Sequence, residues 1–174
     1  MDNERRTRQS TAPPIDPPGN SGAAHLQNIF SAISWALLVG VMFGGYSLLR
    51  MLSSGDGLTD HEEQFFRAGH AHAGVLNVIG ILYGTYLGRT MLSARHQVAA
   101  WLTYILGVAL MSGGFFVHMA VGEPGDGSIG TTLTATGGVI LAITVLYLAW
   151  HLFRARDIGS VNIGRKSYES GEQG

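Results

Sequence analysis

Four long apolar blocks, separated by short polar connections, limit this chain to a helical fold. The blocks run from about Asn28 to Leu49, Phe65 to Leu87, Val98 to Val121 and Thr131 to Leu152. Each has close to the ~20 residues with which a helix crosses the hydrocarbon core of a bilayer. Because lipid offers the backbone no hydrogen-bond partners, blocks of this length must satisfy their own backbone as helices. The sequence therefore predicts an all-α, integral membrane four-helix bundle.

The small number of charged residues supports this class. Only 13% of the 174 residues are charged, whereas about a quarter of the residues in a soluble domain are charged. The chain contains no cysteine, which excludes disulfide and thiolate chemistry. It has no basic face for nucleic acid and no phosphate-binding glycine loop for a nucleotide. We therefore expect membrane lipid and a small lipophilic molecule, and no nucleic acid, as its partners.

The apolar blocks divide the chain into three parts. Residues 1–26 and 157–174 are polar and rich in proline, glycine or serine, so we expect disordered tails there. Residues 27–156 are expected to form the transmembrane domain. Its helices are expected at about 28–50, 64–88, 97–121 and 130–154.

Basic residues set the expected orientation in the membrane. They precede the first block, occupy the second connection and follow the fourth block: Arg5, Arg6, Arg8, Arg89, Arg95, Arg154, Arg156, Arg165 and Lys166. The first and third connections are acidic, and we expect His61, in the first of them, to be solvated. Since basic loops stay in the cytoplasm, the sequence predicts a multi-pass protein of the cell membrane with both termini cytoplasmic.

The stretch "RAGHAHAGVLN", from Arg67 to Asn77, introduces ionisable and amide groups into the second apolar block. Ionisable residues within a membrane span indicate function. At about 100° per residue, His70, Gly74 and Asn77 share one helix face. His72 points about 200° away from His70, so the two histidines cannot bind one metal ion from a regular helix.

Small residues accompany the histidines in the second and third blocks. In the third block Gly107, Met111, Gly114 and His118 share a face. Such a stripe either packs helices closely or leaves room for a flat ligand. A single imidazole on a smooth helix face suits haem b, whose iron takes an axial histidine. A zinc site needs three or four protein ligands, so haem b is the favoured cofactor.

The stretch "RAGHAHAGVLNVIG" resembles the second-helix signature of small four-helix membrane isomerases, the styrene oxide isomerase and hydroxylaminobenzene mutase family. The chain length, the four apolar blocks and the glycine-rich third block are also similar. The resemblance implies a homo-oligomer, a trimer, with haem b at the subunit interfaces and ferric iron acting as a Lewis acid on the substrate oxygen. It also implies that "AHAG" carries the axial ligand, His72, and that the family's asparagine is Asn77.

The chain departs from the family pattern at two places. Histidine and asparagine are six residues apart in the family, whereas Asn77 follows His72 by five residues and His70 by seven. The ligand therefore stays open between His70 and His72. The family's tyrosine, which follows Gly-Phe in the third helix, is replaced here by Phe116 in "GGFFVHM", with His118 two residues on. His118 is therefore a candidate for the missing proton donor.

These features together predict a membrane-embedded, haem-dependent isomerase acting on a small lipophilic epoxide or arylhydroxylamine. Asn77 and His118 are the expected catalytic residues, and His72, His70 and Gly74 the expected haem contacts, with His72 on the iron. Two alternatives remain. One is a non-enzymatic membrane b-type cytochrome with bis-histidine haem, and the other is a helical membrane protein without a cofactor.

Overall fold

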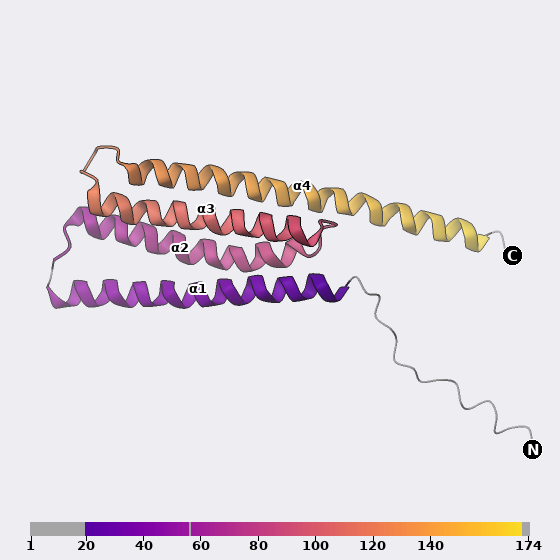
Figure 1. The fold of residues 1–174 in the computed structure, drawn as a ribbon, viewed down its shortest axis with the longest axis horizontal. Coiled ribbons are helices and arrows are strands. Elements are labelled where there is room, and N and C mark those ends of the chain that lie inside the picture. Colours follow the sequence, from indigo (N-terminus) through magenta and orange to yellow (C-terminus); the bar gives the residue numbers. More distant parts are fainter. Residues whose placement is uncertain (1–19, 56, 172–174) are drawn as a thin grey trace, which may run out of the picture.

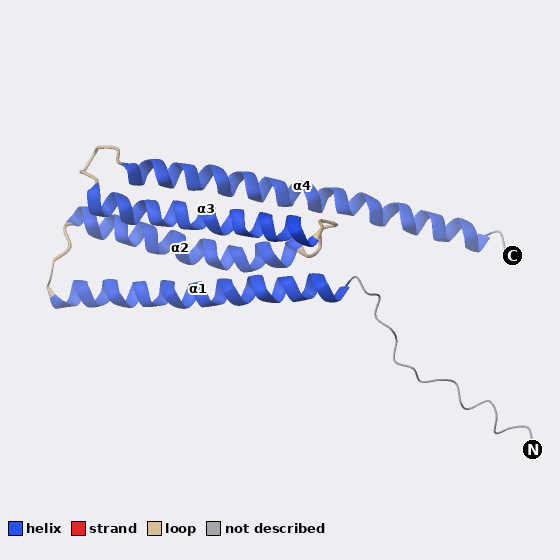
Figure 2. Ribbon diagram, in the orientation of Figure 1, coloured by secondary structure: helices blue, strands red, loops and turns tan. Residues whose placement is uncertain are grey.

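The structure, a computed structural model, describes residues 20–55 and 57–171. In these residues the regular structure is entirely α-helical, with no strand (Figure 2). There are four helices: α1 (Asn20–Ser54), α2 (Asp60–Leu87), α3 (Ala94–Val121) and α4 (Ile129–Gly171). The all-α prediction with four helices is confirmed.

The helices lie in a row that follows their order in the chain (Figure 1). Each helix packs against the next, whereas α1 and α4 do not contact each other in the described part of the chain. The α1–α2 and α3–α4 connections lie at one end of the row, and the α2–α3 connection lies at the other (Figure 1). We call the first end, which includes residues 37–54, 60–77, 109–121 and 129–136, the histidine half, and the remainder of the packed row the aromatic half.

Two helices extend beyond their expected limits. α1 begins at Asn20 rather than near residue 28, and α4 continues to Gly171 rather than ending near residue 154. Parts of both expected tails are therefore helical, because adding residues to an existing helix needs no new nucleus. Residues 1–19 and 172–174 of the expected tails lie outside the described residues.

The start of α2 is set by its cap. Thr59 accepts a hydrogen bond from the Glu62 backbone N–H at 3.3 Å, and its own backbone N–H donates to the Glu62 carboxylate at 2.7 Å. These two bonds form a capping box, which satisfies backbone groups that have no partner within the helix. The acidic residues after Thr59 thus belong to the first turn of α2, where the helix dipole favours negative charge.

Three of the four helices are long and apolar enough to cross a membrane. The spans are Ala24–Ser54, Ala94–Val121 and Ile129–Ala155, within α1, α3 and α4. They are compatible with a multi-pass membrane protein. α2 is not among them and carries both histidines and the asparagine of the expected site as well as an acidic first turn.

Stacked aromatic rings fill the aromatic half. Phe30 of α1 stacks on Trp101 of α3 with ring centroids 4.8 Å apart, and Tyr83 of α2 stacks on Tyr104 at 4.6 Å. The Tyr83 hydroxyl donates to the Thr144 carbonyl at 3.2 Å, and the Tyr104 hydroxyl donates to the Leu76 carbonyl at 2.8 Å. Buried hydroxyls that find partners add no desolvation penalty to the packing. These rings connect all four helices.

Glycines join α3 to α4 along the row. A Cβ atom on Gly114 would meet the Gly130 carbonyl oxygen at 2.6 Å, and one on Gly137 would meet the Gly107 carbonyl oxygen at 2.8 Å. The two backbones therefore touch, which is the close approach that small residues permit between membrane helices. The glycine stripe of α3 serves helix packing rather than leaving room for a flat ligand.

Candidate functional site

A cavity of about 380 Å³ lies between α1, α2 and α3 in the histidine half. We call it the α1–α3 cavity. Its volume falls in the range of about 300–1,000 Å³ that is typical of small-molecule sites. α1 contributes Gly40 and Gly44 to the lining, α2 contributes His70 and Asn77, and α3 contributes apolar side chains and one serine.

His70 lies on the α1 side of this cavity. Its ring packs against two glycines of α1, because a Cβ atom on Gly45 would lie 3.0 Å from the ring Cε1 and 3.1 Å from Nε2. A Cβ atom on Gly44 would lie 3.7 Å from Nδ1. The ring makes no hydrogen bond to any residue that the structure describes. Glycine at these positions leaves room for an imidazole whose nitrogens are not engaged by the protein.

Two buried polar side chains of the cavity each have a polar atom without a partner in the described structure. Asn77 is 5% exposed and Ser112 is 6% exposed. The Asn77 side-chain nitrogen donates to the Ala73 carbonyl at 2.8 Å, but its Oδ1 has no partner in the described structure. The Ser112 hydroxyl also has none there. Buried polar atoms are normally hydrogen-bonded, so these two unpaired atoms, both in residues of the cavity lining, are exceptions.

The cavity opens along the seam between α1 and α3. Leu37, Gly40 and Ala109, which belong to its lining, are exposed at the surface. A Cβ atom added to Gly40 or to Gly113 would meet nothing within 4 Å. The two helices thus leave open space in front of the polar groups of α2.

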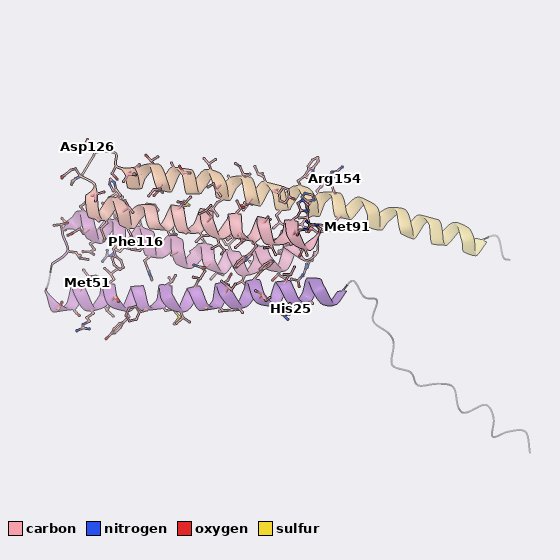
Figure 3. The ribbon with its side chains drawn as sticks, viewed as in Figure 1. His25, Met51, Met91, Phe116, Asp126 and Arg154 are labelled. Atoms are coloured by element: carbon pink, nitrogen blue, oxygen red, sulfur yellow. The ribbon has the colours of Figure 1, made fainter. Side chains whose placement is uncertain are left out.

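Phe116 forms another wall of the cavity. It lies in the half of the molecule that also holds Met51 and Asp126 (Figure 3). The tip of its ring packs against α2, since a Cβ atom on Gly69 would lie 3.1 Å from the ring Cζ, and the ring meets Phe66 edge to face at 5.3 Å. Phe116 therefore borders the same cavity as His70 and Asn77.

His72 lies on a different face of α2. Its Nδ1 bonds to the Ala68 carbonyl at 2.8 Å, and its ring lies against Phe115 of α3 at 4.8 Å. A hydrogen bond through Nδ1 orients the imidazole and leaves Nε2 as the nitrogen that would bind a metal. The expected divergence of the two histidines is confirmed, because His70 faces α1 and His72 faces α3.

His118 lines a second cavity, of about 230 Å³, between α2, α3 and α4. It is buried, and its Nδ1 lies 2.7 Å from the Ser128 hydroxyl and 3.4 Å from the Thr131 hydroxyl. Phe65 of α2 packs edge-on against it, with ring centroids 4.2 Å apart. Within one chain His118 and Asn77 therefore belong to separate cavities.

The contacts of His61, Arg67 and Gly74 are also defined. The expectation that His61 is solvated is wrong, since its Nε2 is buried and its ring lies 5.2 Å from that of His118. Arg67 forms an ion pair with Glu63, one turn earlier. A Cβ atom on Gly74 would lie 3.6 Å from the Val41 side chain, so Gly74 packs against α1 beside the cavity.

The structure thus brings together only part of the predicted site. His70 and Asn77 share the α1–α3 cavity, while His72 and His118 lie outside it. The sequence reasoning missed Ser112. A signal was present, because Ser112 follows Ala109 by three residues and precedes Phe116 by four, which places the three on one helix face.

A conventional metal site is absent from the residues that the structure describes, where no three histidine, cysteine or acidic side chains form a group that could hold a metal ion. Haem requires no such group, since the porphyrin supplies four nitrogens and the protein one or two axial ligands. No protein-family model matches the chain, and neither the curated proteins nor the solved structures contain a match to it.

Proposed function

We propose that this protein is a membrane-embedded, haem-dependent isomerase that acts on a small lipophilic substrate of the epoxide or arylhydroxylamine type. The observation that carries the proposal is the α1–α3 cavity, where a free imidazole, His70, and a buried amide, Asn77, line one open space. The resemblance of "RAGHAHAGVLNVIG" to the membrane isomerases supplies the reaction class.

Haem b would take its axial ligand from this cavity. The His70 imidazole is not engaged in a hydrogen bond with any described residue, and glycines of α1 rather than larger side chains lie beside its ring. When bound, ferric haem supplies a Lewis acid that polarises the substrate oxygen. His70 would hold the iron, and Asn77 would orient the substrate through its unpaired oxygen.

The resemblance favours His72 as the ligand instead, and the bond from its Nδ1 to the Ala68 carbonyl suits that role. We nevertheless favour His70, because His72 and Asn77 have different neighbours, whereas His70 and Asn77 share one cavity. His118 lines the second cavity, so this proposal gives it no contact with a substrate held by Asn77 of the same chain.

A site of this kind suits an isomerisation. The product contains the same atoms as the substrate, so the reaction needs no nucleotide or second substrate. A lipophilic molecule dissolved in the bilayer would reach the cavity through the seam between α1 and α3, whose rim is exposed. His70, Asn77 and Ser112 are the polar residues that line the cavity it would enter.

We further propose that the chain is a four-span protein of the cell membrane with both termini cytoplasmic, assembled as a homo-oligomer, a trimer by resemblance. The distribution of basic residues supports this orientation. Reporter fusions that are active only in the cytoplasm test it. We expect activity from fusions at either terminus and at Arg89, and none from a fusion at Gly125. An active fusion at Gly125 would contradict the topology.

The enzymatic proposal is tested with membranes that contain the haem-loaded protein. Incubation with styrene oxide should give phenylacetaldehyde, or incubation with phenylhydroxylamine should give aminophenol. Asn77→Leu should lower turnover, whereas Gln97→Leu, which changes a buried amide in the aromatic half, should not. Haem-loaded protein that converts neither compound would refute the isomerase. A low-spin ferric spectrum would then favour the bis-histidine cytochrome.

A further inference from the structure

The Asn77 amide has a fixed orientation, which determines what it can offer a ligand. One of its two terminal atoms lies 2.8 Å from the Ala73 carbonyl oxygen. A carbonyl only accepts hydrogen bonds, so this atom must be the amide nitrogen. The other atom, Oδ1, is therefore the one left without a partner. An amide oxygen is an acceptor only, so it needs a donor from the ligand.

The location of Asn77 distinguishes it from other buried atoms without partners. Ser34, Gln97 and Trp101 also contain such atoms, but none of the three lines either cavity. Asn77 and Ser112 do line the α1–α3 cavity. These two residues thus line space that a ligand can enter, and both side chains are more than nine-tenths buried.

The unpaired atoms of Ser112 and Asn77 require different hydrogen-bonding groups on a ligand. The Ser112 hydroxyl donates or accepts, so it can pair with an oxygen or with an N–H group. Asn77 Oδ1 accepts only. A ligand without a donor would satisfy Ser112 and still leave Asn77 Oδ1 buried and unpaired, which is the costly arrangement. Sites built around such groups discriminate strongly against analogues that lack the matching group.

We infer that the α1–α3 cavity selects a small, largely apolar molecule that presents an N–H or O–H donor to Asn77 Oδ1. Asn77 is then the residue that determines specificity in this cavity. The inference rests on the proposed function insofar as it chooses between the two substrate types. An arylhydroxylamine carries N–H and O–H donors, whereas an epoxide carries only an acceptor.

Indole and benzofuran provide a matched pair of probes. Both are flat bicyclic rings of nearly equal size, but indole has an N–H donor where benzofuran has an acceptor oxygen. Equilibrium dialysis of the purified full-length protein in detergent, against protein-free micelles, gives the two dissociation constants. We expect indole to bind about tenfold more tightly than benzofuran. In Asn77→Leu the preference should fall to about twofold or less, and in Gln97→Leu it should persist.

Several outcomes would overturn the inference. They are equal affinities in the wild-type protein, tighter binding of benzofuran, a preference that survives in Asn77→Leu, and no binding of either probe. If Asn77→Leu does not fold, the wild-type ratio still decides the sign of the preference. Gly113→Leu then tests whether the probes bind in the α1–α3 cavity. A side chain at this position would enter open space there and should abolish binding of both probes. Gly138→Leu on α4 is the matched control and should bind normally.

Failure of this inference is distinguishable from failure of the proposed function. The dialysis requires neither turnover nor a haem spectrum. An indole preference in a protein that binds no haem would refute the haem isomerase and leave the donor selectivity standing. Haem binding with no preference between the probes would refute the donor selectivity alone.

Discussion

The two halves of the helix row are built from the same four helices but are packed differently. In the aromatic half, large rings fill the space between helices, and the hydroxyls of Tyr83 and Tyr104 reach carbonyl partners. The histidine half also contains rings packed between α2 and α3, such as Phe65 against Phe115 and Phe66 against Phe116. There, however, α1 carries Gly40 and Gly44, and the remaining space is lined by Asn77 and Ser112, each of which has an unpaired polar atom. The size of the α1 side chains therefore decides where the row is packed and where it can admit a ligand.

The contrast does not extend to the α3–α4 seam. There the glycines bring backbone against backbone in both halves, so that helix pair is tightly packed throughout. The helix that differs most in its packing is α1. Near Phe30 it is packed against α2 and α3, while near Gly40 it leaves open space. The cavity thus arises where α1 carries glycines opposite a histidine.

The largest expected effect concerns the α3–α4 seam. Gly137→Leu introduces a side chain where a Cβ atom would already meet the Gly107 carbonyl oxygen at 2.8 Å, so the helices must separate. We expect loss of monodisperse protein on size-exclusion chromatography. Gly138→Leu changes the adjacent residue, whose Cβ atom would meet nothing within 4 Å, and should elute like the wild type. Equal behaviour of the two variants would contradict this packing.

The next largest effect compares the two halves directly. Trp101 is buried and stacked on Phe30, so Trp101→Ala should lower the free energy of unfolding by about 3–5 kcal/mol. Phe116→Ala should cost about half as much, because one side of that ring already borders a cavity. Unfolding in mixed detergent micelles measures both. A larger loss for Phe116→Ala would reverse the assignment of packed and open halves.

Much of this architecture could be predicted from the sequence, because it depends on local pattern. The limits of α2 and α3 lie within four residues of those expected, and helical phase separated His70 from His72. The cavity could not be predicted, since its walls at Gly40 and Ser112 depend on how α1 and α3 dock across α2. The burial of His61 against His118, a residue far along the chain, was missed for the same reason.

A smaller effect sharpens the role of α1 in the cavity. A Cβ atom at position 45 would lie 3.0 Å from the His70 ring, whereas one at position 44 would make an ordinary contact at 3.7 Å. Gly45→Ala should therefore displace the imidazole and weaken hemin affinity about tenfold. Gly44→Ala should stay close to the wild type in a hemin titration. Equal affinities for the two variants would show that the ring position does not matter.

The smallest effect concerns the first turn of α2. Thr59→Ala removes the cap, so amide exchange at residues 62 and 63, whose N–H groups bond to Thr59, should be about fivefold faster, corresponding to ~1 kcal/mol. The Thr59 backbone N–H, which donates to the Glu62 carboxylate, lowers the pKa of Glu62 below its ordinary value of 4.5. The cap therefore stabilises the turn above that pH and is lost as the pH falls through the lowered pKa. If neither Thr59→Ala nor a fall in pH through the lowered pKa of Glu62 changes the protection of these amides, the capping box is contradicted.

The central claim, that His70 in the α1–α3 cavity holds haem, is tested most directly by the visible absorption spectrum of purified protein titrated with hemin. The wild type, His70→Ala and His72→Ala are measured side by side. We predict a Soret band in the wild type and in His72→Ala, and its loss in His70→Ala. A wild type that forms no Soret band with hemin, or a His70→Ala variant that retains the wild-type spectrum, would contradict the account.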